Sequence, residues 1–226
     1  MTRPMLDEDT CALCGAVSEQ THLLSNTTFG ASDLDGRPPL EMGRFPLDWW
    51  MHRCPHCGYC ATDIGRAPAG ADEVVGSEAY RRQLADPLVP DLARSFLCAA
   101  MLAEADAGSG SGAVVSALVC AAWVCDDAGD APGAVRCRLR AASALETLRA
   151  AGGSYAGDEP SADDALLADL YRRAGLFEEA AAAARAGLQR AGTTFSRQLL
   201  ELQLHLAATR DTAAHTCDEA LADQGE

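Results

Sequence analysis

The chain lacks lysine entirely. Its 18 basic residues are all arginine and stand against 33 acidic residues, which gives a formal net charge of -15. Residues 1–70 and residues 71–226 are each acidic. A nucleic-acid backbone would meet net repulsion over most of such a protein, and metal-bound thiolates would add to it. The composition therefore disfavours nucleic acid as a partner.

Segments that would direct the chain to a membrane are also missing. The longest apolar run, residues 113–125, is shorter than the ~20 residues that a membrane-spanning helix needs. Residues 7–9 are acidic where a secretory signal peptide has its apolar core. We therefore expect a soluble cytoplasmic protein without a membrane partner, in which thiols stay free or bind metal.

Motifs of the common enzyme classes are absent from the sequence as well. It contains no Ser/His/Asp arrangement, nucleophile elbow, phosphate loop or dinucleotide fingerprint. The glycines of residues 108–112 neither follow a predicted strand nor carry a lysine. We expect that the chain is not an enzyme.

Two cysteine motifs organise what is present. Cys11 and Cys14 are followed by a glycine, and so are Cys54 and Cys57. A CxxCG turn points two thiolates at one cation, and its glycine permits the positive φ that the turn requires. The four sulfurs predict one structural Zn²⁺ site, closed because four thiolates fill the tetrahedron. The sequence does not distinguish zinc from iron.

Other residues near the second motif leave alternatives open. Cys57 and Cys60 form a further CxxC that fits a redox pair or an exchange of metal ligands. A simpler interpretation makes Cys60 a small buried residue on the outgoing strand. His52 and His56 flank the motif and could replace one cysteine, although we favour four thiolates.

The segment between the two motifs predicts a zinc ribbon. Residues 21–29 and 45–53 have the composition and alternation of strands, and residues 32–39 contain the Asp-Gly and Pro-Pro pairs typical of a loop. Asp33, Asp35 and Arg37 of that loop either bind a ligand or hold the loop by Asx-type hydrogen bonds and an Asp–Arg pair. We favour the second interpretation.

From residue 72 onward the pattern changes to helix. Ala, Leu, Arg and Glu recur at helical spacing, with breaks at Gly- and Pro-rich stretches. The predicted helices cover residues 72–85, 90–106, 112–128, 131–150, 162–174, 177–191, 194–209 and 211–222. The fold class is therefore mainly α, with a zinc-ribbon module over 1–70 and a helical domain over 71–226.

The later helices carry a tetratricopeptide-like pattern. Tyr171, Gly175 and Ala180 occupy its aromatic, turn and small positions, and the same frame recurs 34 residues later with His205 in the aromatic position. A degenerate copy precedes them. Such units cannot bury their apolar faces alone, so the pattern predicts a stacked superhelix with a groove.

In their order along the chain, these motifs resemble a bacterial family of unknown function. The resemblance rests on residues 11–15, 24–30, 33–39 and 53–60, and extends more weakly over 90–145. Members join a zinc-ribbon-like N-terminal part to tetratricopeptide-like helices. The resemblance implies a cytoplasmic, zinc-associated helical-repeat protein and no established reaction.

The function that these patterns favour is a non-enzymatic zinc-binding scaffold or adaptor with a protein or peptide partner. Four residues are candidates for partner contact: Trp49, Trp50, Arg136 and Arg140. The alternative is a thiol redox or metal-dependent enzyme or sensor that uses Cys57 and Cys60.

Some further residues have plain structural interpretations. Asp126 and Asp127 come before a glycine and predict a solvated turn rather than a catalytic pair. Cys98, Cys120 and Cys137 lie on apolar helix faces and predict core positions.

Overall fold

A computed structural model describes residues 3–25, 29–39, 47–108 and 110–222, and within them the fold is mainly α, as predicted. The strands are β1 (Arg3–Thr10), β2 (Val17–Ser25), β3 (His52–Arg53) and β4 (Cys60–Ala61), and η1 (Leu47–Trp49) is a short 3-10 helix. The helices are α1 (Ala71–Gly76), α2 (Glu78–Ala85), α3 (Asp91–Ala107), α4 (Gly112–Asp127), α5 (Ala131–Ala150), α6 (Ala162–Arg173), α7 (Phe177–Leu188), α8 (Thr194–Ala208) and α9 (Glu219–Ala222).

Side-chain caps explain where several helices begin. Ser111 caps α4 by accepting from the Val114 N–H, and Thr193 forms a reciprocal capping box with Ser196 at the start of α8. Ser77 caps α2 in the same way, with an extended backbone at ψ 151°. The predicted helix 72–85 is therefore divided into α1 and α2 at Ser77.

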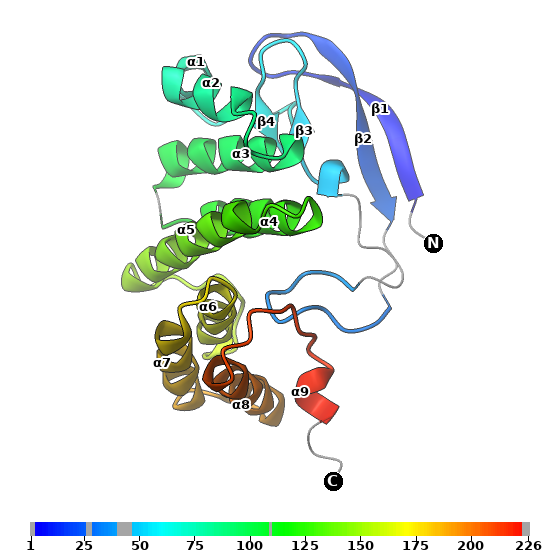
Figure 1. Ribbon diagram of the computed structural model, residues 1–226. Coiled ribbons are helices and arrows are strands. Elements are labelled where there is room, and N and C mark those ends of the chain that lie inside the picture. The colour runs from blue at the N-terminus through cyan, green and yellow to red at the C-terminus, as the bar shows by residue number, and fades with distance from the viewer. Residues whose placement is uncertain (1–2, 26–28, 40–46, 109, 223–226) are drawn as a thin grey trace.

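From α3 to α8, each helix packs against the next one along the chain, which forms the elongated stack in Figure 1. This is the packing that a repeat superhelix requires, and the repeat itself stays a prediction. None of the described helices is long and apolar enough to cross a membrane.

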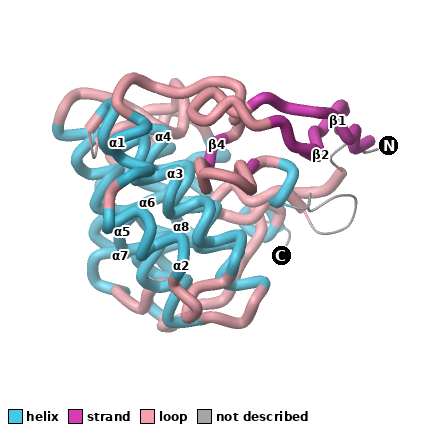
Figure 2. The backbone as a smooth tube through the Cα atoms, turned by 90° about the horizontal axis from the view of Figure 1, so that it is seen from above, coloured by secondary structure: helices cyan, strands magenta, loops and turns pink. Residues whose placement is uncertain are grey.

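The β part differs from the predicted ribbon. Each cysteine motif lies at the tip of its own antiparallel hairpin, β1–β2 for the first and β3–β4 for the second. The predicted strand 21–29 is shifted: β2 begins at Val17 and ends at Ser25, Phe29 lies outside it, and residues 26–28 are outside the described part. Figure 2 shows β1 and β2 projecting from one side of the helical body.

The predicted strand 45–53 is wrong over most of its length. Residues 45 and 46 lie outside the described part, and residues 47–49 form η1. The Trp50 N–H donates to the Leu47 carbonyl oxygen at 3.1 Å and closes this turn. Only His52 and Arg53 pair as a strand.

The hairpins and the helices share one apolar core. Its largest cluster contains Cys11, Tyr59 and Ile64 from the hairpin region together with helical residues such as Phe96 and Leu145. The division into modules 1–70 and 71–226 stays a prediction, because this core runs across the boundary.

Residues 211–218 are not helical, contrary to the predicted helix 211–222. The Arg210 backbone has a left-handed φ of 58°, and the chain then turns back toward the 29–39 loop. There the Leu34 N–H donates to the His215 carbonyl oxygen at 2.9 Å, and the Cys217 N–H donates to that of Ser32 at 2.8 Å. Figure 1 shows the two segments, far apart in sequence, side by side.

Candidate metal centre

The first cysteine motif forms a tight turn between β1 and β2. The Cys11 N–H donates to the Ala16 carbonyl oxygen at 2.9 Å, and the Gly15 N–H donates to the Cys11 carbonyl oxygen at 2.9 Å. Gly15 has a φ of 70°, which residues with a Cβ adopt only at a cost. The local sequence therefore dictates the turn.

The second motif repeats this turn. The Cys54 N–H donates to the Tyr59 carbonyl oxygen at 2.9 Å, and the Gly58 N–H donates to the Cys54 carbonyl oxygen at 3.0 Å, with a φ of 79° at Gly58. A Cβ at Gly58 would also lie 2.6 Å from Cδ2 of Leu84. The positive φ favours glycine here, whereas the end of the Leu84 side chain could move aside.

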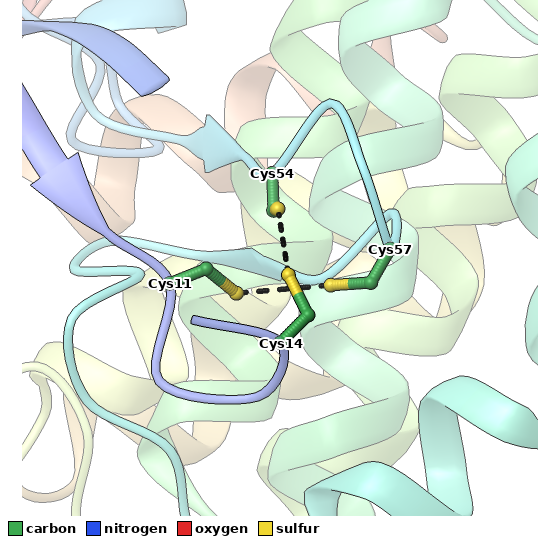
Figure 3. A group of neighbouring side chains, drawn as sticks. All are labelled: Cys11, Cys14, Cys54 and Cys57. Carbon is green, nitrogen blue, oxygen red and sulfur yellow. Dashed lines mark hydrogen bonds between the residues drawn. The ribbon is translucent and has the colours of Figure 1, made fainter. Parts of the chain in front are cut away.

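Tertiary packing brings the four sulfurs together (Figure 3). The Cys11 and Cys57 sulfurs are 3.7 Å apart, those of Cys14 and Cys54 are 3.6 Å apart, and all four lie within 4.8 Å of one another. Tetrahedral Zn–S bonds of about 2.3 Å place sulfurs about 3.8 Å apart, whereas a disulfide needs about 2.05 Å. This cluster has the spacing of a metal centre, and the four cysteines can hold one ion.

The cluster lies where the two hairpin tips meet. Cys11 and Cys54 are buried, Cys57 is half-buried, and Cys14 is exposed. The Ala12 N–H donates to the Ile64 carbonyl oxygen at 2.9 Å, which ties the first tip to the chain that leaves the second. A cation at this point would join the tips of the two hairpins.

The surroundings of Cys54 and Cys57 shift their pKa values in opposite directions. Burial acts to raise the pKa of Cys54, but the backbone N–H groups of Cys57 and His56 and the neighbouring thiols lower it to about 7. Burial, together with hydrogen bonds to the other thiols, raises the pKa of Cys57 to about 12. The protein alone thus favours thiolate at Cys54 and opposes it at Cys57, and a divalent ion bound here would favour the thiolate form of all four.

The neighbouring candidates lie outside this cluster. Cys60 is 0% exposed on β4, and its thiol donates to the Gly58 carbonyl oxygen at 3.3 Å. His56 is exposed and His52 is buried, and neither belongs to the four-sulfur group. Cys98, Cys120 and Cys137 are buried in the core.

The 33–37 loop is held by one hydrogen bond within the loop and by contacts to side chains of the helices. The Arg37 N–H donates to Oδ1 of Asp35 at 3.2 Å, which is the expected Asx turn. Oδ2 of Asp35 also accepts from Nε1 of Trp123 and from Nη1 of Arg173, each at 2.8 Å. The Arg37 guanidinium pairs with Asp127. The loop is therefore anchored to α4 and α6.

Asp126 is not the solvated turn residue that the sequence predicts. Its carboxylate pairs with Arg138, which is 2% exposed, and with Nη2 of Arg173 at 2.8 Å. Although burial acts in the opposite direction, these guanidinium groups lower the pKa of Asp126. Sequence reasoning missed Arg138 and Arg173, because nothing local marks an arginine whose partner is distant in sequence.

The candidate contact residues occupy different surroundings. Trp49 and Trp50 are half-buried, and the Trp50 ring packs edge-on against Trp123 with centroids 6.4 Å apart. Arg136 and Arg140 are exposed on α5, where Nη2 of Arg140 lies 3.6 Å from Glu104.

The fold and this cluster define a mainly α protein with a four-cysteine centre that can hold a metal ion. No family model, curated protein or solved structure matches the chain. The resemblance to a bacterial zinc-ribbon and tetratricopeptide family therefore stays a prediction carried by the motifs alone.

Proposed function

We propose that this chain is a non-catalytic cytoplasmic zinc protein that binds a peptide or protein partner on its helical body, as a scaffold or adaptor. Zinc at the four cysteines would fix the two hairpins against the helices. An all-thiolate site leaves no position for water or substrate, which supports a structural role. Ten free thiols support a reducing compartment.

Two adjoining cavities carry the proposal of a binding surface. The first has a volume of about 620 Å³, and its lining includes Trp50, Phe96 and Leu102. The second has a volume of about 490 Å³ and is lined in part by Leu34, Phe195 and Leu199. Trp123 and Tyr155 line both, so the cavities meet at these two rings.

The lining and the charge define the partner that would fit. The walls are mostly apolar and aromatic, which suits the side chains of an apolar or aromatic anchor. Asp106 is one of the residues that line the first cavity, and the whole chain carries a net charge of -15. A peptide with apolar anchors flanked by arginine or lysine is the complementary partner.

A displayed-peptide selection on the zinc-loaded chain tests this proposal. Ala113 is exposed and lines the first cavity, so Ala113→Arg would obstruct the cavity without disturbing the core. Ala105 is exposed on α3 and is not among the lining residues, so Ala105→Arg is the matched control. We expect selected peptides to lose at least about tenfold in affinity with Ala113→Arg only. Peptides indifferent to Ala113→Arg, or no enrichment, would overturn the proposed surface.

The redox alternative, with Cys57 and Cys60 as the exchanging pair, has one observation in its favour. Hydrogen bonding with the Cys98 thiol lowers the pKa of Cys60, although burial opposes this. Full burial of Cys60, however, keeps oxidants and alkylating agents away. We expect Cys60 to stay unmodified when the native metal-loaded protein is alkylated and analysed by mass spectrometry, and a reactive Cys60 would favour the redox function instead.

A further inference from the structure

A second group of potential ligands lies beside the hairpins. Asp9 of β1, His22 of β2 and His52 of β3 each offer one ligand atom, and these three atoms lie within 4.8 Å of one another. Asp9 pairs with Ser18 in the hairpin, and His22 lies on the same face of β2 as Ser18, four residues further on. The group is therefore assembled by three strands.

The surroundings of His52 leave one ring nitrogen available. His52 is 3% exposed, and its Nε2 lies 3.1 Å from the Thr21 carbonyl oxygen, which can only accept. Nε2 therefore carries the proton, and Nδ1 keeps its lone pair. Nδ1 is buried and has no hydrogen-bond partner. Metal-binding histidines typically have this arrangement, with one nitrogen held by a carbonyl and the other free for the cation.

The contact between Asp9 and His22 also suits a pair of ligands. Oδ2 of Asp9 is 2.9 Å from Nε2 of His22, yet Oδ2 is buried without a hydrogen bond of acceptable geometry. Ligand atoms about 2.1 Å from one cation lie about 3.0–3.4 Å apart in octahedral or tetrahedral sites. The His22 and His52 rings meet edge-on, with centroids 4.5 Å apart at 78°.

We propose that Asp9, His22 and His52 form a second metal site, distinct from the four cysteines, that takes a first-row divalent cation such as Zn²⁺ or Fe²⁺. Two imidazole nitrogens and one carboxylate oxygen suit these ions. The side chains of His22 and Asp9 are 30% and 20% exposed, so one side of the site faces solvent. That side leaves room for water or a small anion on the cation, unlike the closed thiolate site.

Cobalt titration of the metal-free full chain tests this site, because Co²⁺ reports its ligands. Thiolate ligands give intense charge-transfer absorption, whereas nitrogen and oxygen ligands give only weak d–d bands. We expect two equivalents to bind, one with and one without the thiolate signal. Asp9→Asn and His22→Ala should each lose only the second equivalent and keep the charge-transfer band.

The control and the contrary results separate this site from an ordinary ion pair. Glu8 is exposed next to Asp9 on β1, so Glu8→Gln removes the same charge and should still bind two equivalents. His52→Ala is avoided because its ring is buried. A single equivalent in the parent protein, or two in Asp9→Asn, would overturn the second site. Neither result depends on peptide binding at the helical cavities.

Discussion

Replacement of Arg172 by methionine would remove a buried cation that ties the C-terminal segment to the helices. Arg172 is 0% exposed. Its Nε donates to Gln203 at 2.9 Å, its Nη2 to Asp169 at 2.6 Å, and its Nη1 to the carbonyl oxygens of residues 211 and 213 at 2.8 and 2.9 Å. The segment that it holds continues to residues 215–217, whose backbone forms hydrogen bonds with residues 32–34 of the 29–39 loop.

The size of the effect follows from what Arg172→Met leaves behind. Asp169 is 1% exposed, and its Oδ2 already has no hydrogen-bond partner. Removal of one partner of a buried ion pair leaves an uncompensated charge and costs about 3–5 kcal/mol. For a chain of this length each 1 kcal/mol corresponds to about 2–4 °C in melting temperature, so we expect a decrease of roughly 6–20 °C.

Urea unfolding followed by circular dichroism measures this loss. The matched control is Arg82→Met, because the Arg82 side chain is 75% exposed and lies 3.8 Å from Glu78, a pair worth at most about 0.5 kcal/mol. A double variant, Arg172→Met with Asp169→Leu, should recover part of the loss, since it removes the stranded charge. The reasoning fails if Arg172→Met unfolds at the same urea concentration as the control.

Three further predictions concern the metal centre and the ionic network. Cys54→Ser should lose the thiolate-bound ion and lower the melting temperature, as measured by metal analysis and calorimetry; full retention of that ion contradicts the site. Gly15→Ala and Gly58→Ala should each cost about 1 kcal/mol of backbone strain because both positions have a positive φ, and Gly58→Ala should cost slightly more because the end of the Leu84 side chain must shift; urea midpoints equal to that of the parent would contradict this. Because the pKa of Asp126 is lowered in the folded state, its contribution is present above the unfolded pKa of about 4 and lost as pH falls through the folded value. Urea unfolding measured across this pH range should show that the free energy of unfolding falls less on acidification for Asp126→Asn than for the parent.

Features that depend on neighbouring residues were predictable. Helices α3 to α8 begin and end close to their predicted bounds. Their signals, apolar periodicity and capping residues such as Ser111, depend only on residues that are close in sequence. The two CxxCG turns were predictable for the same reason, since the glycine after the second cysteine of each motif provides the positive φ. These local rules grouped Cys11 with Cys14, and Cys54 with Cys57.

Features that depend on distant partners were decided only by the tertiary structure. β1 was missed because its side chains are mostly exposed and show no apolar alternation, so only pairing with β2 makes it a strand. The 211–218 segment contains only two good helix formers, Ala213 and Ala214, and its path is set by distant partners: Arg172 binds its carbonyl oxygens and the 29–39 loop pairs with it. Tertiary packing likewise brings Asp9, His22 and His52 together from three strands. The sequence by itself determined the two CxxCG turns and helices α3 to α8. The three-dimensional contacts determined which of them meet, because a hydrogen bond or an ion pair between distant residues leaves no periodicity in either segment.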